Sequence, residues 1–140
     1  MNAVDKAHSF ACVQALASVV TLVKTRFPEA SPSFAPWRDD PQTRRWSERE
    51  TLDLAFYFPG WSPRLQCRSM LVQLRVKEAS PQKDHPVLLG VMIRGMTYEG
   101  ERWRLVTIDN WAPTGSHLPQ QEQVGQLQEI CRELFTLFSY

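Results

Sequence analysis

Glycine and cysteine are scarce in this sequence, and both shortages exclude classes of function. Only six glycines occur in 140 residues, and none forms the cluster before a helix that lets backbone N–H groups approach a phosphate. The three cysteines, Cys12, Cys67 and Cys131, lie far apart, so no CxxC pair exists for a zinc ribbon or a thioredoxin-like redox site. We interpret them as isolated buried thiols in a reducing compartment, which predicts a cytoplasmic protein.

An excess of charge is also missing. Sixteen Lys and Arg residues balance fifteen Asp and Glu residues, so no global field attracts nucleic acid or an anionic membrane, whereas self-association is permitted. The apolar stretch from Phe10 to Val23 is too short to span a bilayer and is interrupted by Gln14 and Ser18. No cationic region precedes it, so we expect a core helix and not a signal peptide, and no membrane partner.

Histidines are few and widely separated. A zinc protease needs two histidines one helical turn apart, and His8, His85 and His117 do not provide that spacing. No G-x-S-x-G motif is present either. We therefore predict no metal ligand and no cofactor.

The best candidate for a catalytic combination consists of Asp109 and His117 with Cys67 or Cys131. Asp109 ends a predicted strand and His117 lies in the loop that follows, so the two could meet. Cys131 falls on the apolar stripe of a predicted helix, which favours a core role. Arg68 follows Cys67 directly, but adjacent strand residues point to opposite faces, so Arg68 would not lower the pKa of that thiol. We predict no catalytic residue and do not expect an enzyme.

What is present is ordinary globular composition with clear periodicity, since 43% of the residues are hydrophobic. The pattern predicts a single α+β domain over residues 1–140, with an N-terminal helix, a long Pro-rich loop, a four-stranded antiparallel meander and a C-terminal helix. The predicted elements are a helix from Val4 to Arg26, strands over Thr51–Phe58, Arg64–Lys77, Val87–Ile93 and Arg102–Asp109, and a helix that begins near Pro119.

The loop over residues 28–47 holds four prolines and several large aromatic side chains. Prolines at this frequency exclude a continuous helix or a central strand. A long irregular segment in a compact domain is usually functional or disordered, and tryptophans favour burial over disorder. We therefore predict an ordered cover in which Trp37 and Trp46 are at least partly buried.

The strand register follows from the turn that we expect at Glu99–Gly100. With those two residues as the hairpin loop, Ile93 lies opposite Val106 and Val91 lies opposite Ile108. These residues, with Val72, Leu74 and Leu89, then form the face that packs against Val124, Leu127, Ile130, Leu134 and Phe138 of the C-terminal helix. The same register places a second apolar group on the opposite face, where no predicted helix remains to cover it: Leu71, Met92, Arg94, Met96, Trp103 and Leu105.

Three coverings of this face are possible: the Pro-rich loop, one of the helices, or another chain. An exposed apolar face usually marks a contact site, and methionines suit an adaptable binding surface, so we favour another chain. We therefore predict a non-enzymatic protein-binding module, such as an assembly factor, an adaptor or a regulatory subunit, that contacts a protein partner or a second copy of the chain. The predicted partner-binding residues are Met92, Arg94, Met96, Trp103, Leu105, Leu71, Trp37 and Trp46. Trp61 and Trp111 are expected at the ends of the sheet, where neither position demands burial.

Two alternatives remain open. The first is a domain that binds a small ligand or single-stranded nucleic acid through the loop tryptophans, because Arg44-Arg45-Trp46 and Arg102-Trp103-Arg104 interleave cations with aromatic rings. On a strand, however, Trp103 points away from the two arginines that flank it, so we favour a solvated face and do not expect nucleic acid as a partner. The second alternative is an enzyme without a recognisable motif.

Overall fold

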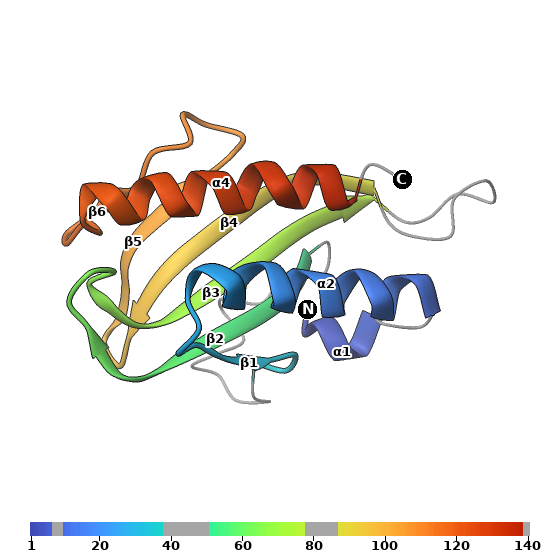
Figure 1. Ribbon diagram of the computed structural model, residues 1–140, viewed down its shortest axis with the longest axis horizontal. Coiled ribbons are helices and arrows are strands. Elements are labelled where there is room, and N and C mark those ends of the chain that lie inside the picture. Colours follow the sequence, from blue (N-terminus) through green and yellow to red (C-terminus); the bar gives the residue numbers. More distant parts are fainter. Residues whose placement is uncertain (7–9, 38–50, 78–86, 139–140) are drawn as a thin grey trace.

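The computed structural model describes residues 1–6, 10–37, 51–77 and 87–138, which form two layers (Figure 1). One layer is an antiparallel sheet of six described strands, which follow one another in chain order from β1 to β6. Helices α2 (Phe10–Arg26) and α4 (Gln121–Leu137) contact each other across one face of the sheet, and the one-turn helix α1 (Ala3–Lys6) precedes them. The predicted α+β class with a helix toward each end is confirmed, but the sheet has six strands and not four.

The two additional strands are short and lie at the edges of the sheet. They were not predicted, because strands of three and two residues carry no measurable alternation. Short edge strands also limit pairing with other chains. The six strands are β1 (Ser31–Ser33), β2 (Thr51–Ser62), β3 (Cys67–Lys77), β4 (Val87–Thr97), β5 (Gly100–Val106) and β6 (Thr114–Gly115).

The core lies between the sheet and the two long helices. Alternate residues of β2 and β3 face the helices, as in the pairs Leu52–Leu74 and Leu54–Val72. Arg26 joins the helices at the surface, because its guanidinium donates to Gln126 Oε1 at 2.6 Å and to Glu133 Oε1 at 2.9 Å. The predicted apolar face of the C-terminal helix is buried as expected, at Val124, Leu127, Ile130, Leu134 and Phe138.

The hairpin between β4 and β5 differs from the prediction. Thr97 pairs with Gly100, so the two-residue loop is Tyr98–Glu99 and not Glu99–Gly100. Gly100 belongs to the strand and has a φ of +120°, a conformation that side-chain-bearing residues rarely adopt. The glycine therefore indicates the turn correctly, but the predicted loop lies one residue too late.

A β-bulge then shifts the register once more along β5. The pairing changes between Gly95 and Met96 and leaves Arg102 as the extra residue of the bulge. Ile93 consequently pairs with Leu105, and not with Val106 as predicted. Because a shift of one residue turns every side chain to the other face, the predicted sides of β5 are reversed.

Trp103 therefore lies in the core, where the prediction placed it on the open face. Its side chain is fully buried, and its indole N–H donates to the carbonyl oxygen of Leu65 at 2.6 Å. The ring lies over Gly95, since a Cβ atom at that glycine would come within 2.2 Å of Trp103 Nε1. Leu105 is buried on the same helix-covered face. The prediction that Trp103 and Leu105 lie on the second face is wrong.

A second bulge lies near the start of β4. Leu88 pairs with Val76 and is buried, whereas the bulged Leu89 is 52% exposed. Ile108 lies beyond the end of β5 and is 74% exposed, and Val106 points away from the helices beside Met92. The predicted core positions of Leu89, Val106 and Ile108 are therefore wrong, because strict alternation does not continue through a bulge or past a strand end.

The segment before β2 is described only as far as Trp37. Trp37 is partly buried, as predicted, and its backbone N–H donates to Asn2 Oδ1 at 2.8 Å. The Asn2 amide in turn donates to the Trp37 carbonyl oxygen at 3.0 Å. The predicted burial of Trp46 concerns a residue outside the described part of the chain.

Candidate functional site

The back face of the sheet, which is the face turned away from α2 and α4, has a buried carboxylate near the start of β2. Asp53 Oδ2 accepts from the amino group of Met1 at 2.9 Å and from the indole N–H of Trp37. Asp53 Oδ1 accepts from Thr51 Oγ1 at 2.6 Å and from Gln73 Nε2 at 3.4 Å. A fully buried carboxylate with four donors is satisfied, so Asp53 holds Trp37 against this face and is not poised for proton transfer.

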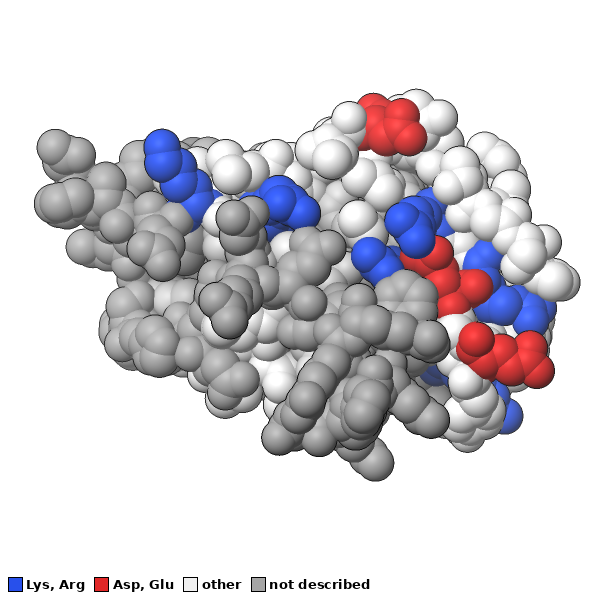
Figure 2. Space-filling model, turned by 180° about the vertical axis from the view of Figure 1, so that it is seen from behind, with Lys and Arg blue, Asp and Glu red and all other residues white. Residues whose placement is uncertain are grey.

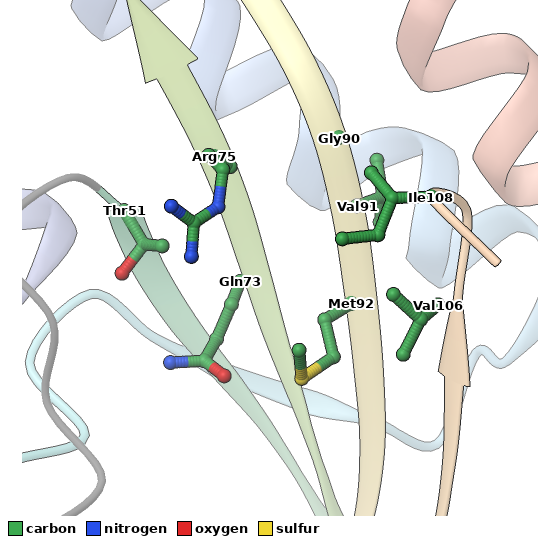
Figure 3. A pocket seen from close by; sticks show the side chains of 8 residues that line it. All are labelled: Thr51, Gln73, Arg75, Gly90, Val91, Met92, Val106 and Ile108. Carbon is green, nitrogen blue, oxygen red and sulfur yellow. The ribbon is translucent and has the colours of Figure 1, made fainter.

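A small hollow lies beside this carboxylate (Figure 3). Its volume is about 40 Å³, which is enough for about three water molecules. Ligand pockets are usually about 300–1,000 Å³, so this hollow fits one small polar group and not a cofactor. One side of its lining is polar and consists of Thr51, Gln73 and Arg75. The other side is mainly apolar and consists of Gly90, Val91, Met92, Val106 and Ile108.

Farther along the back face, two arginines share one carboxylate. Arg104 makes a two-pronged contact with Glu101, with N–O distances of 2.7–3.0 Å. Arg94 Nε lies 3.7 Å from Glu101 Oε1 and donates to Met92 Sδ at 3.0 Å. Figure 2 shows acidic and basic side chains intermixed on the described part of this face. The face is therefore more polar than the apolar surface that was predicted.

A larger depression lies at the hairpin end of the sheet. The β2–β3 and β4–β5 turns both occur at this end (Figure 1). The volume of the depression is about 700 Å³, which is within the usual range for binding pockets. The backbone N–H of Gln120, just before α4, donates to the Arg64 carbonyl oxygen at 2.8 Å and fixes this part of the chain against the helix. We call the depression the hairpin groove; its lining residues are Glu29, Phe58, Pro59, Gly60, Trp61, Ser62, Pro63, Arg64 and Gln120.

Two exposed aromatic rings at this end are each covered by an arginine. The guanidinium of Arg102 lies 5.3 Å from the ring centre of Trp61, which is 41% exposed. The guanidinium of Arg68 lies 4.7 Å from the ring centre of Tyr98, which is 89% exposed, and donates to its hydroxyl at 3.1 Å. Cation–π contacts at exposed sites contribute about 0.5–1 kcal/mol, so each contact favours this orientation of its ring.

Arg102 reaches Trp61 because it is the bulged residue of β5. Its Nε is buried and has no hydrogen-bond partner within the described structure. A buried donor without a partner costs free energy, which its neighbours must offset. The bulged residue therefore holds a guanidinium over the ring of Trp61, which lines the hairpin groove, at a cost in local stability. Bulges often direct a side chain in this way at functional sites.

The cysteines are unsuited to nucleophilic chemistry. Burial raises the pKa of the Cys67 thiol from 9.0 to about 12, although a hydrogen bond with the Met96 backbone partly opposes the rise. Burial likewise raises the pKa of the Cys131 thiol from 9.0 to about 12, with partial opposition from the charge of Arg132. The reactive form of cysteine is the thiolate, which such pKa values make very rare at neutral pH.

The remaining members of the weak catalytic combination do not meet. Asp109 and His117 are exposed, and His117 Nδ1 lies 3.1 Å from Ser116 Oγ. Among the described residues, no hydrogen bond joins His117 to Asp109 or to a cysteine. A search of the same residues finds no group of three or more potential metal ligands.

The predicted partner-binding residues separate into four groups. Leu71, Met92, Arg94 and Met96 lie on the back face, as predicted, with Leu71 and Arg94 buried. Trp37 borders that face through Asp53. Trp103 and Leu105 belong to the core. Trp46 lies outside the described residues.

Sequence reasoning missed the arginines of the hairpin end. Trp61 carried a signal, because it follows a Pro-Gly turn at a predicted sheet end. Its partner Arg102 is 41 residues away in the sequence and reaches it only through a bulge. No local pattern could indicate that pairing.

Comparison with known proteins gives a family but no named relative. Within the described helices, none is both long enough and apolar enough to cross a membrane. No curated protein and no solved structure matches the chain. A family described as a domain of unknown function matches residues 4–140. Because this match covers nearly the whole chain, the protein belongs to that family of domains of unknown function.

Proposed function

We propose that this protein is a non-enzymatic protein-binding module, such as an assembly factor, an adaptor or a regulatory subunit, and that its partner binds at the hairpin end. The observation that carries this proposal is the exposed Trp61, which is held by Arg102 at the wall of the hairpin groove. Tryptophan, tyrosine and arginine are the residues that most often dominate binding energy at protein interfaces.

The hairpin end suits a protein partner better than the back face does. Trp61 and Tyr98 are exposed rings with restrained positions, so binding would order little additional side-chain freedom. Trp103 and Leu105, two of the apolar side chains of the predicted binding face, are in the core. The proposal therefore keeps the function predicted from the sequence and moves its centre from Trp103 to Trp61.

Size excludes the back-face hollow, but not the hairpin groove, as a site for the small-ligand alternative. The back-face hollow offers about 40 Å³, whereas the hairpin groove offers about 700 Å³. A groove of that size accommodates several side chains of a partner. The cytoplasmic location belongs to the same proposal, and the buried thiols of Cys67 and Cys131 support it.

Affinity purification from the native source tests the proposal. We expect one or more proteins to co-purify with the wild-type chain, and we expect their recovery to fall at least tenfold with Trp61→Ala. Replacing a central tryptophan of an interface by alanine commonly weakens binding by this factor. Ile108→Ala is the matched control, because Ile108 is also an exposed apolar side chain but lies beyond the opposite end of β5. Equal recovery with wild type and Trp61→Ala would contradict the assignment of this surface.

A further inference from the structure

The charges around the hairpin groove are unevenly balanced. Arg64 lines the groove, Arg102 lies on the Trp61 ring of its wall, and Arg68 lies nearby at the same end of the sheet. Within the described parts of the chain, no carboxylate forms an ion pair with any of these three arginines. Elsewhere the arginines Arg26 and Arg104 are each paired with a glutamate.

The nearest acidic residues do not neutralise this side of the groove. Glu101 is already shared by Arg94 and Arg104 on the back face. Glu29 lines the groove at the end of α2 and is exposed. Glu99 lies in the β4–β5 turn at the same end and is exposed, but it does not line the groove. The groove lining therefore holds one arginine and one carboxylate, and Arg102 and Arg68 add two further positive charges at this end of the sheet.

We propose that the hairpin groove binds an acidic protein segment, whose carboxylates face Arg64 and Arg102 and whose apolar side chain lies against Trp61. This inference rests on the proposed function and adds the chemical class of the partner. Guanidinium groups pair with carboxylates through two parallel hydrogen bonds, which makes arginine well suited to such recognition. Stacking on an aromatic ring leaves the N–H edge of a guanidinium available for a carboxylate.

The groove also supplies the apolar part of this recognition. Phe58, Pro59, Trp61 and Pro63 form most of its apolar lining. Phe58 is supported from behind by Phe27, with ring centres 6.5 Å apart in an edge-to-face arrangement. The apolar wall is thus anchored to the core at the end of α2, and it does not depend on a partner for its shape.

A displayed library of random peptides of about twelve residues is the probe, because extended segments are a common mode of groove recognition. We expect selection on the wild-type protein, with counter-selection on Trp61→Ala, to enrich peptides that combine Asp or Glu with a large apolar residue. Enrichment of basic peptides, or of apolar peptides without acidic residues, would overturn the inference.

Affinities of the best peptide for single variants sharpen the test. We expect Arg64→Gln and Arg102→Gln each to weaken binding about two- to fivefold, as partly exposed ion pairs do. Glu29→Gln should strengthen it, because a like charge is removed. Arg132→Gln is the control, since Arg132 is an exposed α4 arginine whose partner is Glu129. Circular dichroism verifies the fold of each variant. Because Arg64 is exposed, Arg64→Gln should disturb the fold less than Arg102→Gln.

The outcomes separate the two proposals. If no enriched peptide needs Trp61, the hairpin end is not the binding surface and both proposals fail. If binding needs Trp61 but is unchanged by Arg64→Gln, by Arg102→Gln and by salt between about 0.05 M and about 0.5 M, only the acidic class is overturned. If binding needs Trp61 and both arginines and weakens with salt, both proposals are supported.

Discussion

Two tryptophans from neighbouring parts of the sheet show how differently the molecule uses the same side chain. Trp103 lies in the core between the sheet and the helices, and its indole N–H is bonded to the Leu65 carbonyl oxygen. Trp61 lies at the hairpin end, 41% exposed, with an arginine over its ring. The comparison teaches that the number of tryptophans says little about function, because the surroundings of each indole differ: one is enclosed in the core and the other faces solvent.

The largest expected effect concerns the buried member of this pair. Trp103→Ala should lower the free energy of unfolding by about 3–5 kcal/mol, because it leaves a cavity over Gly95 and removes the partner of a buried carbonyl group. Urea denaturation measures the change. A loss below about 1 kcal/mol would mean that the ring is not part of the core.

The helix side of the same core gives a comparable test. Leu134→Ala should cost about 2–5 kcal/mol, because Leu134 is fully buried on the face of α4 that packs against the sheet. Glu133→Ala is the neighbouring control and should change stability by less than about 1 kcal/mol, since it removes only a surface ion pair with Arg26. Similar losses for the two variants would show that the buried face of α4 is misassigned.

The buried thiols make the core sensitive to alkaline pH. Below pH 9 the thiols stay protonated in both states, whereas between pH 9 and pH 12 only the unfolded chain releases their protons. The contribution of these thiols to the free energy of unfolding should therefore be fully present below pH 9.0 and should fall as the pH rises above that value. The expected fall is up to about 1.4 kcal/mol per pH unit for each thiol.

Denaturation at about pH 8 and about pH 10 measures this loss. Cys67→Ala and Cys131→Ala should each reduce the pH dependence relative to wild type, because each removes one of the two thiols whose pKa is raised to about 12. Other groups titrate in the same range, so the difference between wild type and variant is the quantity to compare. An unchanged slope in both variants would contradict the burial of these thiols.

The smallest stability effect is expected at the exposed tryptophan. Trp61→Ala should change the free energy of unfolding by less than about 1 kcal/mol, because it removes a surface ring and one cation–π contact. Thermal or urea denaturation beside Trp103→Ala makes the comparison direct. A loss for Trp61→Ala as large as that for Trp103→Ala would assign Trp61 a structural role and remove the main support for a recognition role.

The sequence predicted the elements better than it predicted their faces. Period-two alternation located the four long strands, and three- to four-residue spacing located both long helices, because each element buries a continuous apolar stripe. The helical positions Leu127, Ile130 and Leu134 are buried as expected. These features depend on local spacing, which a single sequence records.

The faces of β4 and β5 could not be predicted in the same way. Two bulges, at Leu89 and Arg102, and a hairpin loop one residue earlier than expected changed which side chains meet. Bulges depend on packing between strands, and nothing in the local sequence indicates them. The pairing of Trp61 with Arg102 was missed because it joins side chains 41 residues apart, which local spacing does not record.

Photo-crosslinking in the native source tests the central claim most directly. A photoreactive benzoylphenylalanine replaces either Tyr98, which is 89% exposed at the hairpin end, or Ile108, which is 74% exposed beyond the other end of β5. We predict a discrete crosslinked product for the Tyr98 position that is absent for the Ile108 position and is lost when Trp61→Ala is combined with it. A product at Ile108 alone, or one at Tyr98 that is unaffected by Trp61→Ala, would contradict the assignment of the hairpin end as the binding surface.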